Sequence, residues 1–159
     1  MHNEGHFGGN ITSQNIWQKF EEFFVSNNCT TLLDFGSGKG VQWEQHPWKS
    51  NPKITCYDPA WPPLSTLPVN NFDMIMSKDC LEHIPMETLE ECVQWIYDHA
   101  DVCTAHFISD APATKNLPNG ENAHCTIMKL DEYEILFRKY AKPGIKTLLF
   151  RSPNEYKVF

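Results

Sequence analysis

The chain has 159 residues, of which 41% are hydrophobic, 21% charged and 13% aromatic. This length favours a single domain, residues 1–159, with enough apolar surface to form a core. The formal net charge of -7 argues against a nucleic-acid partner, because such binding relies on many Lys and Arg contacts to phosphate. Binding to an anionic membrane is disfavoured for the same reason, and no apolar run approaches the ~20 residues of a membrane-spanning helix.

The N-terminal segment and the cysteines indicate the compartment. Residues 1–10 lack the basic start and apolar centre of a signal peptide. The six cysteines include no Cys-x-x-Cys pair, and His2, His6, His83 and His124 lack the spacing of a metal site. We therefore expect a reduced, cytoplasmic protein with no bound metal. The glycine-rich segment 1–12 is expected either to fold over a ligand as a lid or to be a flexible terminus.

Apolar periodicity and turn residues predict strands that alternate with helices. Asp131 and Glu134 are expected to cap the last helix, and Pro143-Gly144 to form a turn. Residues 59–71 are expected to be loop, with room for one short strand near Leu64–Leu67. The predicted elements are, in chain order, a helix at 13–25 capped by Thr12 or Ser13, a strand at 30–35, a brief helix that Pro47 ends, strands at 53–58 and 72–77, a helix from Pro85 to about Asp101, a strand at 102–109, a long loop at 110–127, a helix after Asp131, and strands at 145–150 and 155–159.

This alternation is typical of an α/β fold with a mainly parallel sheet. The closing strand pair is expected to add an antiparallel strand at one edge of the sheet. The sequence therefore predicts a single three-layer domain with a Rossmann-like, doubly wound sheet.

The segment "LLDFGSGKG", residues 32–40, predicts a strand followed by a turn in which a ligand contacts bare backbone. A phosphate-binding P-loop would need Ser or Thr after Gly-Lys, whereas here Lys39 is followed by Gly40 and Val41. A dinucleotide-binding loop would follow Gly-x-Gly-x-x-Gly, but the third glycine comes one residue early. The pattern is Gly-x-Gly-x-Gly, preceded by Asp34.

That pattern resembles the first motif of the class I S-adenosylmethionine-dependent methyltransferases. Asp58 follows Gly38 by 20 residues, as does the acid that binds the cofactor ribose in that family. "NFDMIMSKDCLEHIP", residues 71–85, is similar to the family's fourth-strand segment, and "LPNGENAHCT", residues 117–126, resembles a run in small bacterial and phage methyltransferase-like proteins. Taken together, the likeness covers roughly residues 30–159.

The resemblance implies a role for each matching residue. S-adenosylmethionine would lie with its methionine part along Gly36, Ser37, Gly38 and Gly40, with Asp34 attracting the ammonium directly or through water. The resemblance also places Asp58 on the ribose, Pro59 and Ala60 along the adenine with Leu67, and Asp79 and Cys80 beside the cofactor. The alternatives are structural: Asp34 as a cap of the next turn, and Asp58 as part of an Asp-Pro turn.

The loop 110–127 is expected to lie at the same edge of the sheet, where long loops are often functional. Within it, His124 and Glu121 are the candidate catalytic groups, with Asn122 as an orienting group. The alternative for His124 is a loop histidine bonded to backbone carbonyls. His83 is expected to be structural, and His106 to lie in the core or at the sheet edge.

The predicted function is S-adenosylmethionine-dependent methyl transfer to a small molecule or sugar. Two alternatives stay open: an enzyme that cleaves the cofactor itself, and a non-catalytic binding subunit that activates a partner. A homodimer that shares an acceptor site is also compatible with the sequence.

Overall fold

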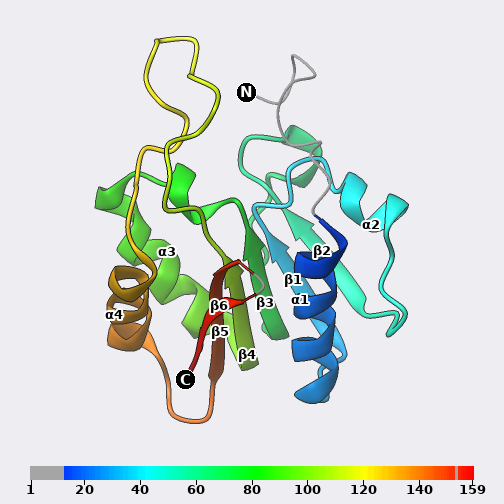
Figure 1. The fold of residues 1–159 in the computed structure, drawn as a ribbon. Coiled ribbons are helices and arrows are strands. Elements are labelled where there is room, and N and C mark those ends of the chain that lie inside the picture. Colours follow the sequence, from blue (N-terminus) through cyan, green and yellow to red (C-terminus); the bar gives the residue numbers. More distant parts are fainter. Residues whose placement is uncertain (1–12, 153) are drawn as a thin grey trace.

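The computed structural model describes residues 13–152 and 154–159. The chain forms an α/β fold around one six-stranded sheet with strand order β2-β1-β3-β4-β5-β6 (Figure 1). All neighbouring strands are parallel except β5 and β6, which are antiparallel. The strands are β1 (Thr31–Phe35), β2 (Lys53–Tyr57), β3 (Phe72–Lys78), β4 (Ala100–Phe107), β5 (Lys146–Ser152) and β6 (Glu155–Val158), and the helices are α1 (Gln14–Ser26), α2 (Val41–Gln45), α3 (Met86–His99) and α4 (Leu130–Tyr140), with short 3-10 helices η2 (Pro62–Leu64) and η3 (Leu81–His83). The α/β class, the mainly parallel sheet and the antiparallel edge strand are thus confirmed, and the arrangement is consistent with a Rossmann-like fold.

Alternate residues of the central strands enter two separate cores. Leu33, Ile75 and Leu149 pack with α3 and α4 on one face of the sheet. Leu32 and Met74 belong to the second core, which includes the aromatic side chains of α1. This alternation follows from the two-residue period of a strand, and it explains why the strand sequences are almost continuously apolar. Both faces are covered, so functional groups are left mainly at the strand ends.

Three details of the sequence prediction are wrong. No strand forms near Leu64–Leu67; this part of the described chain holds η2 instead, because Pro62 and Pro63 favour a tight helical turn over strand pairing. The helix expected to reach Asp101 ends at His99, and Ala100 already begins β4. The third concerns the start of α4.

Helix α4 begins at Leu130, one residue before the expected capping pair. The cap is made by Glu132, whose carboxylate accepts the Lys129 N–H at 2.8 Å. Asp131 and Glu134 instead form ion pairs with Lys157 on β6. At α1, Ser13 is the cap residue, but its side chain makes no capping hydrogen bond. Thr12 and the proposed lid at 1–12 lie outside the described residues.

Candidate functional site

The glycine loop directly follows β1 at the carboxyl edge of the sheet. Gly36, Gly38 and Gly40 all have positive φ, at 80°, 59° and 73°. The Gly36 and Ser37 N–H groups donate to the Tyr57 carbonyl at 2.8 and 3.0 Å, which ties the loop to the end of β2. Left-handed backbone at three alternate positions strongly favours glycine, so the pattern noticed in the sequence is required by the backbone itself.

Asp58 is the residue that fixes the shape of this loop. Its side chain is 7% exposed. One carboxylate oxygen accepts the Gly38 N–H and the other accepts the Ala60 N–H, both at 2.8 Å. The sequence-predicted loop and the acid 20 residues later are therefore brought into direct contact. A ribose bound here would share both oxygens with these backbone donors.

Gly36 and Cys80 meet between β1 and β3. A Cβ atom added at Gly36 would lie 2.2 Å from the Cys80 sulfur and 2.7 Å from its Cβ. The bare backbone at Gly36 is thus filled from within the protein by the Cys80 side chain. Burial, followed by the nearby carboxylates of Glu82 and Asp58, raises the pKa of the Cys80 thiol well above its usual value, so the thiol stays protonated.

Asp79 precedes this contact with a φ of 47°, and its carboxylate pairs with Lys78 at 3.0 Å. Left-handed backbone is uncommon outside glycine and turns the chain sharply after β3. The turn directs Cys80 toward the glycine loop. Of the residues predicted to surround a cofactor, Gly36, Gly38, Asp58 and Cys80 are therefore close neighbours at one edge of the sheet.

Asp34, the last acid of β1, is 5% exposed. Its carboxylate accepts a hydrogen bond from the Trp43 indole of α2 at 2.8 Å. Burial raises the pKa of Asp34 to about 6, although the indole bond and the charge of Lys78 lower it. A buried carboxylate is costly for the fold, and such groups gather at functional sites.

Glu82 was missed as a site residue by the sequence reasoning, which treated it only as part of a motif. It is fully buried on η3, and one carboxylate oxygen accepts the Ser109 N–H at 3.0 Å. The other oxygen has no hydrogen-bond partner among the described residues. Burial, with a smaller contribution from Asp79, raises the pKa of Glu82 to about 7. The signal available in the sequence was an acid placed just after a buried strand.

Glu82 also anchors both ends of the loop 110–127. Its carboxylate binds Ser109 at the start of the loop, and its backbone carbonyl accepts the Thr126 N–H at 3.0 Å. The Thr126 hydroxyl donates to the Ile84 carbonyl at 2.7 Å. The loop that projects from the carboxyl edge in Figure 1 is therefore fastened at its base.

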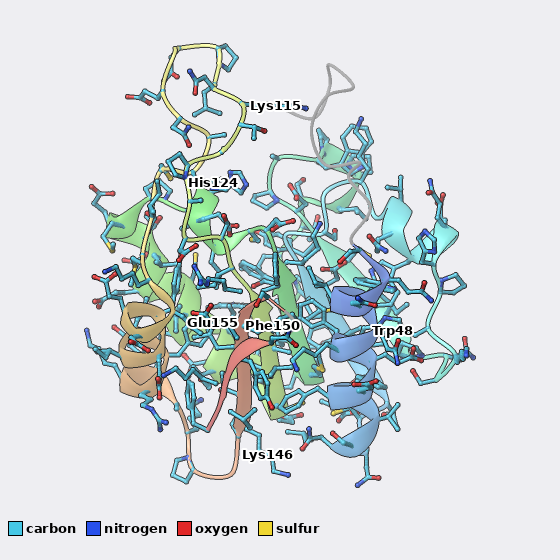
Figure 2. All side chains as sticks on the ribbon, in the orientation of Figure 1. Trp48, Lys115, His124, Lys146, Phe150 and Glu155 are labelled. Carbon is cyan, nitrogen blue, oxygen red and sulfur yellow. The ribbon has the colours of Figure 1, made fainter. Side chains whose placement is uncertain are left out.

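His124 lies at the base of this loop (Figure 2). Its ring contacts that of His83. The two rings meet edge to face, with centroids 4.8 Å apart. The Nδ1 atom of His83 lies 2.7 Å from the Ala123 carbonyl, and that of His124 lies 2.6 Å from the Ala111 carbonyl. A carbonyl only accepts, so each Nδ1 carries a proton and donates it, which leaves each Nε2 as the lone-pair nitrogen when the ring is neutral. Burial and the neighbouring His124 lower the pKa of His83, which favours its neutral form at pH 7.

The other candidates occupy different places. Glu121 is exposed, and it forms hydrogen bonds with Asn119 and Leu117 within the loop. Asn122 holds the loop together, with its amide bonded to both backbone groups of Ala113 at 2.9 and 3.0 Å. His106 is fully buried, bonds the Ser77 hydroxyl at 2.7 Å, and has a pKa that burial lowers to about 3. Of the two places expected for His106, the core and the sheet edge, the structure shows the core.

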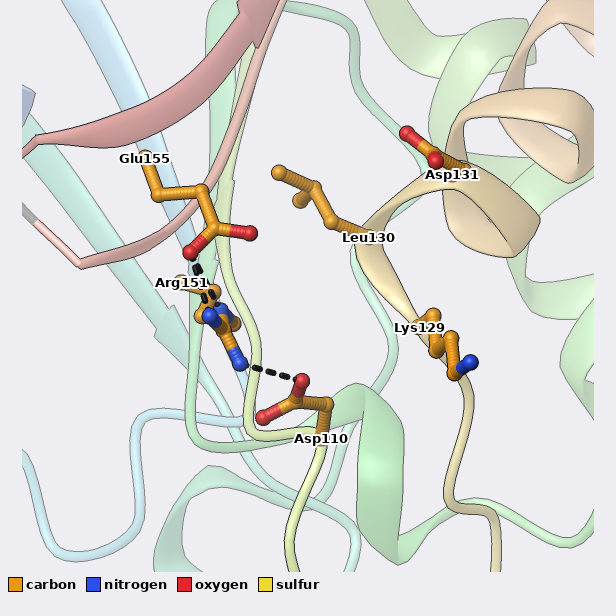
Figure 3. Close-up of a pocket in the computed structure, with 6 residues that line it drawn as sticks. All are labelled: Asp110, Lys129, Leu130, Asp131, Arg151 and Glu155. Carbon is orange, nitrogen blue, oxygen red and sulfur yellow. Dashed lines mark hydrogen bonds and ion pairs between the residues drawn. The ribbon is translucent and has the colours of Figure 1, made fainter.

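A polar pocket of about 280 Å³ lies farther along the same edge, where β5 and α4 meet (Figure 3). Arg151 sits between Asp110 and Glu155 and forms ion pairs with both. Lys129, Leu130 and Asp131 complete the lining. Three strand spacings separate β1 from β5, or roughly 14 Å, so this pocket is distinct from the glycine loop.

The chain was also compared with known proteins. No protein-family model matches it, and a search of curated proteins finds no match. Within residues 13–152 and 154–159, no three His, Cys, Asp or Glu side chains are grouped so that they could hold a metal ion. None of the helices in this part of the chain has the length and apolar character needed to cross a membrane.

Proposed function

We propose that this chain is an S-adenosylmethionine-dependent methyltransferase that acts on a small molecule or sugar, built on a three-layer Rossmann-like domain. The observation that carries the proposal is the 2.8 Å bond between the Gly38 N–H and the Asp58 carboxylate. It joins the two most specific parts of the methyltransferase-like pattern at the carboxyl edge, where open α/β sheets bind their ligands.

The proposed roles follow from charge and position. Asp34, with a pKa of about 6, is mostly ionised at pH 7 and attracts the ammonium group of the cofactor directly or through water. Asp58 takes the ribose hydroxyls, and Pro59 and Ala60 line the adenine. Asp79 and Cys80 close the site from the β3 side.

The reaction is an in-line displacement at the methyl carbon, and alignment of the two reacting groups supplies much of the acceleration. Where the acceptor must lose a proton, the Nε2 atom of His124 is the proposed base, with Nδ1 held by the Ala111 carbonyl. Glu121 has a weaker claim to this role, because its bonds hold it within the outer loop.

Calorimetric titration of the full chain with S-adenosylmethionine and S-adenosylhomocysteine tests the proposal. We expect binding to both, and a loss of about 1–3 kcal/mol of binding free energy in Asp58→Ala. Asp98→Ala is the matched control, because Asp98 is an exposed acid paired with Lys142. Since Asp58 also shapes the loop, thermal unfolding of the variant must show that it is folded. A response to NADH or ATP, with none to either sulfur nucleoside, would overturn the proposal.

A second measurement distinguishes the two alternative functions, cleavage of the cofactor and non-catalytic binding. The protein is incubated with S-adenosylmethionine and no acceptor, and the products are analysed. Formation of methylthioadenosine or a homoserine product identifies the cofactor-cleaving enzyme. Tight binding without turnover on any acceptor supplied favours the non-catalytic binding subunit.

A further inference from the structure

Two buried thiols face each other at the amino edge of the sheet. The sulfur atoms of Cys29 and Cys103 are 3.6 Å apart, although 74 residues separate them in the chain. Cys29 lies between α1 and β1 and is 8% exposed, while Cys103 on β4 is fully buried. Cys103 is the pairing partner of Lys146, which Figure 2 places at the end of the sheet opposite His124. The thiol pair is therefore remote from the proposed cofactor site.

The pKa values of the two thiols are shifted in opposite directions. A hydrogen bond with Cys103 lowers the pKa of Cys29, in spite of burial and the nearby Asp73. The same bond, together with burial, raises the pKa of Cys103, and Lys146 offsets this only in part. Cys29 is also the more exposed of the two, at 8% against 0% for Cys103, so it is the sulfur that a small oxidant reaches first. Reactive pairs in which one thiolate is oxidised and a second thiol resolves it have this division of roles.

We propose that Cys29 and Cys103 form an oxidative modification site that closes to an intramolecular disulfide when the protein meets a hydroperoxide. The Cys29 thiolate attacks one peroxide oxygen, the O–O bond breaks, and water leaves after protonation, giving a sulfenic acid on Cys29. The Cys103 sulfur then attacks the Cys29 sulfur and a second water leaves. Two thiols together lose two protons and two electrons, and these convert one hydrogen peroxide into two waters.

The geometry permits this closure with little movement. A disulfide needs the sulfurs to approach by about 1.5 Å from their present separation, which is within the reach of side-chain rotation. The bond would join the segment between α1 and β1 to β4 and close a ring that contains β1, β2, β3 and α3. A cross-link over so long a loop removes much conformational freedom from the unfolded chain. Oxidation is therefore expected to raise the melting temperature and to leave the glycine loop unchanged.

The experiment oxidises the full chain with hydrogen peroxide, alkylates the remaining thiols after denaturation, and maps the peptides by mass spectrometry. The background is Cys125→Ser, because Cys125 is exposed and would otherwise form cross-links between molecules. We expect one cross-linked peptide pair holding Cys29 and Cys103, a mass lower by two hydrogens, alkylation of Cys56, Cys80 and Cys92, and reversal by dithiothreitol. Cys92→Ala is the matched control and should leave the cross-link in place.

A second variant tests the order of steps. Cys103→Ala, which keeps an apolar side chain in the core, should stop the reaction at a sulfenic acid on Cys29 that a dimedone probe traps. If Cys103→Ala fails to fold, the peptide map of the Cys125→Ser protein still decides whether the disulfide forms, and the oxidised form should melt at a higher temperature than the reduced form. The proposal is overturned if Cys29 and Cys103 remain fully alkylated after oxidation, or if either cross-links instead to another cysteine. Neither outcome depends on binding of S-adenosylmethionine, so it leaves the proposed function untouched.

Discussion

The acids at the two edges of the sheet have pKa values shifted in opposite directions. At the amino edge, the Asp73 carboxylate accepts three hydrogen bonds, from the Thr30 N–H and hydroxyl and from the Thr31 N–H, at 2.7, 2.7 and 2.9 Å. Burial raises the pKa of Asp73, but these bonds outweigh it and hold the pKa below its usual value. Asp73 is therefore an acid that stabilises the fold.

At the carboxyl edge, burial dominates instead. The pKa rises to about 6 for Asp34 and to about 7 for Glu82, because neither carboxylate has enough donors to offset the loss of water. These acids cost stability when ionised, and the fold retains them where ligands bind in open α/β sheets. The two edges therefore differ in whether hydrogen bonds offset the loss of water around their acids.

The largest change in unfolding free energy is expected at Gly36, which contacts Cys80 at the carboxyl edge of the sheet. Gly36→Ala forces a Cβ into the Cys80 side chain at a φ of 80° and should cost about 3 kcal/mol of unfolding free energy. Gly144→Ala, in the turn before β5, is the matched control: its φ is 89°, but no atom lies within 4 Å of the added Cβ, so about 1 kcal/mol is expected. Urea denaturation measures both.

A second substitution, at Cys80, separates the cost of the contact between the added Cβ atom and Cys80 from the cost of the positive φ at position 36. Adding Cys80→Gly to Gly36→Ala removes both close atoms, whereas Cys80→Ala would keep a Cβ at 2.7 Å. The loss of unfolding free energy in the Gly36→Ala/Cys80→Gly double variant should therefore be smaller than the sum of the losses in the two single variants. Equal costs for Gly36→Ala and Gly144→Ala would show that Cys80 does not fill the space at Gly36.

The next prediction is a gain of stability, on replacement of Asp34. The pKa of Asp34 is raised from 3.8 in the unfolded chain to about 6 in the fold, so the folded state binds the extra proton and stability falls as pH rises through this window. Asp34→Asn keeps the acceptor for Trp43 and removes the charge. We expect it to be more stable than the parent by about 2 kcal/mol at pH 8 and to lose this advantage toward pH 4. The affinity for S-adenosylmethionine should fall at the same time.

Denaturation at several pH values checks this prediction. Glu82→Gln should show the same behaviour in a higher window, between 4.5 and about 7, because the pKa of Glu82 is raised for the same main reason. A stability difference that does not change with pH would mean that these acids are not charged and buried at neutral pH, and the contrast between the two edges would fail.

Much of the carboxyl edge was predictable because its geometry is local or repeats a known spacing. Apolar runs that contain or precede an acid predicted β1 and β2, and the resemblance placed Gly38 and Asp58 around one ligand, although their direct hydrogen bond was not foreseen. Parallel strands then bring their carboxyl ends to one side. The features that escaped prediction depend on distant packing. Glu82 is buried by a loop that returns more than 40 residues later, and the pairing of His83 with His124 crosses a similar gap.

The smaller errors have local causes. The cap of α4 depends on which residue starts the helix. A shift of two positions moves the N-cap from Asp131 to Lys129 and the capping acid from Glu134 to Glu132. Asp131 is free to pair with Lys157 only because β6 lies beside the helix, and its position is set by tertiary structure. In the same way, two prolines decided between a strand and a 3-10 turn at Pro62–Leu64.

A smaller loss of stability is expected at the amino edge. Asp73→Ala removes the acceptor of two backbone N–H groups and should cost about 1–2 kcal/mol, a moderate value because the carboxylate is partly exposed. Since the folded pKa of Asp73 is below its usual value, its contribution is present above pH 3.8 and is lost as pH falls through the folded pKa. The gap between variant and parent should narrow in strong acid, and the reverse trend would contradict the structural role of Asp73.

The smallest effect on global stability is expected from Asn122, because its bonds lie within the loop alone. Asn122→Ala removes the bonds to Ala113 and to the His124 N–H, at 2.9, 3.0 and 3.0 Å. Unfolding free energy should change by about 0.5 kcal/mol or less, while backbone amides near 113–124 exchange about tenfold faster. Asn119→Ala, which loses bonds only to Glu121 at the outer end, is the matched control.

The outcome decides whether the loop and the glycine site are separate units. Glu82 fastens the base of the loop through Ser109 and Thr126, below the bonds that Asn122 makes. Loosening the loop above that base should leave the affinity for S-adenosylmethionine unchanged and affect only the placement of His124. If Asn122→Ala also weakens the binding of that nucleoside, the loop contributes to cofactor binding, and the carboxyl edge works as one site rather than two.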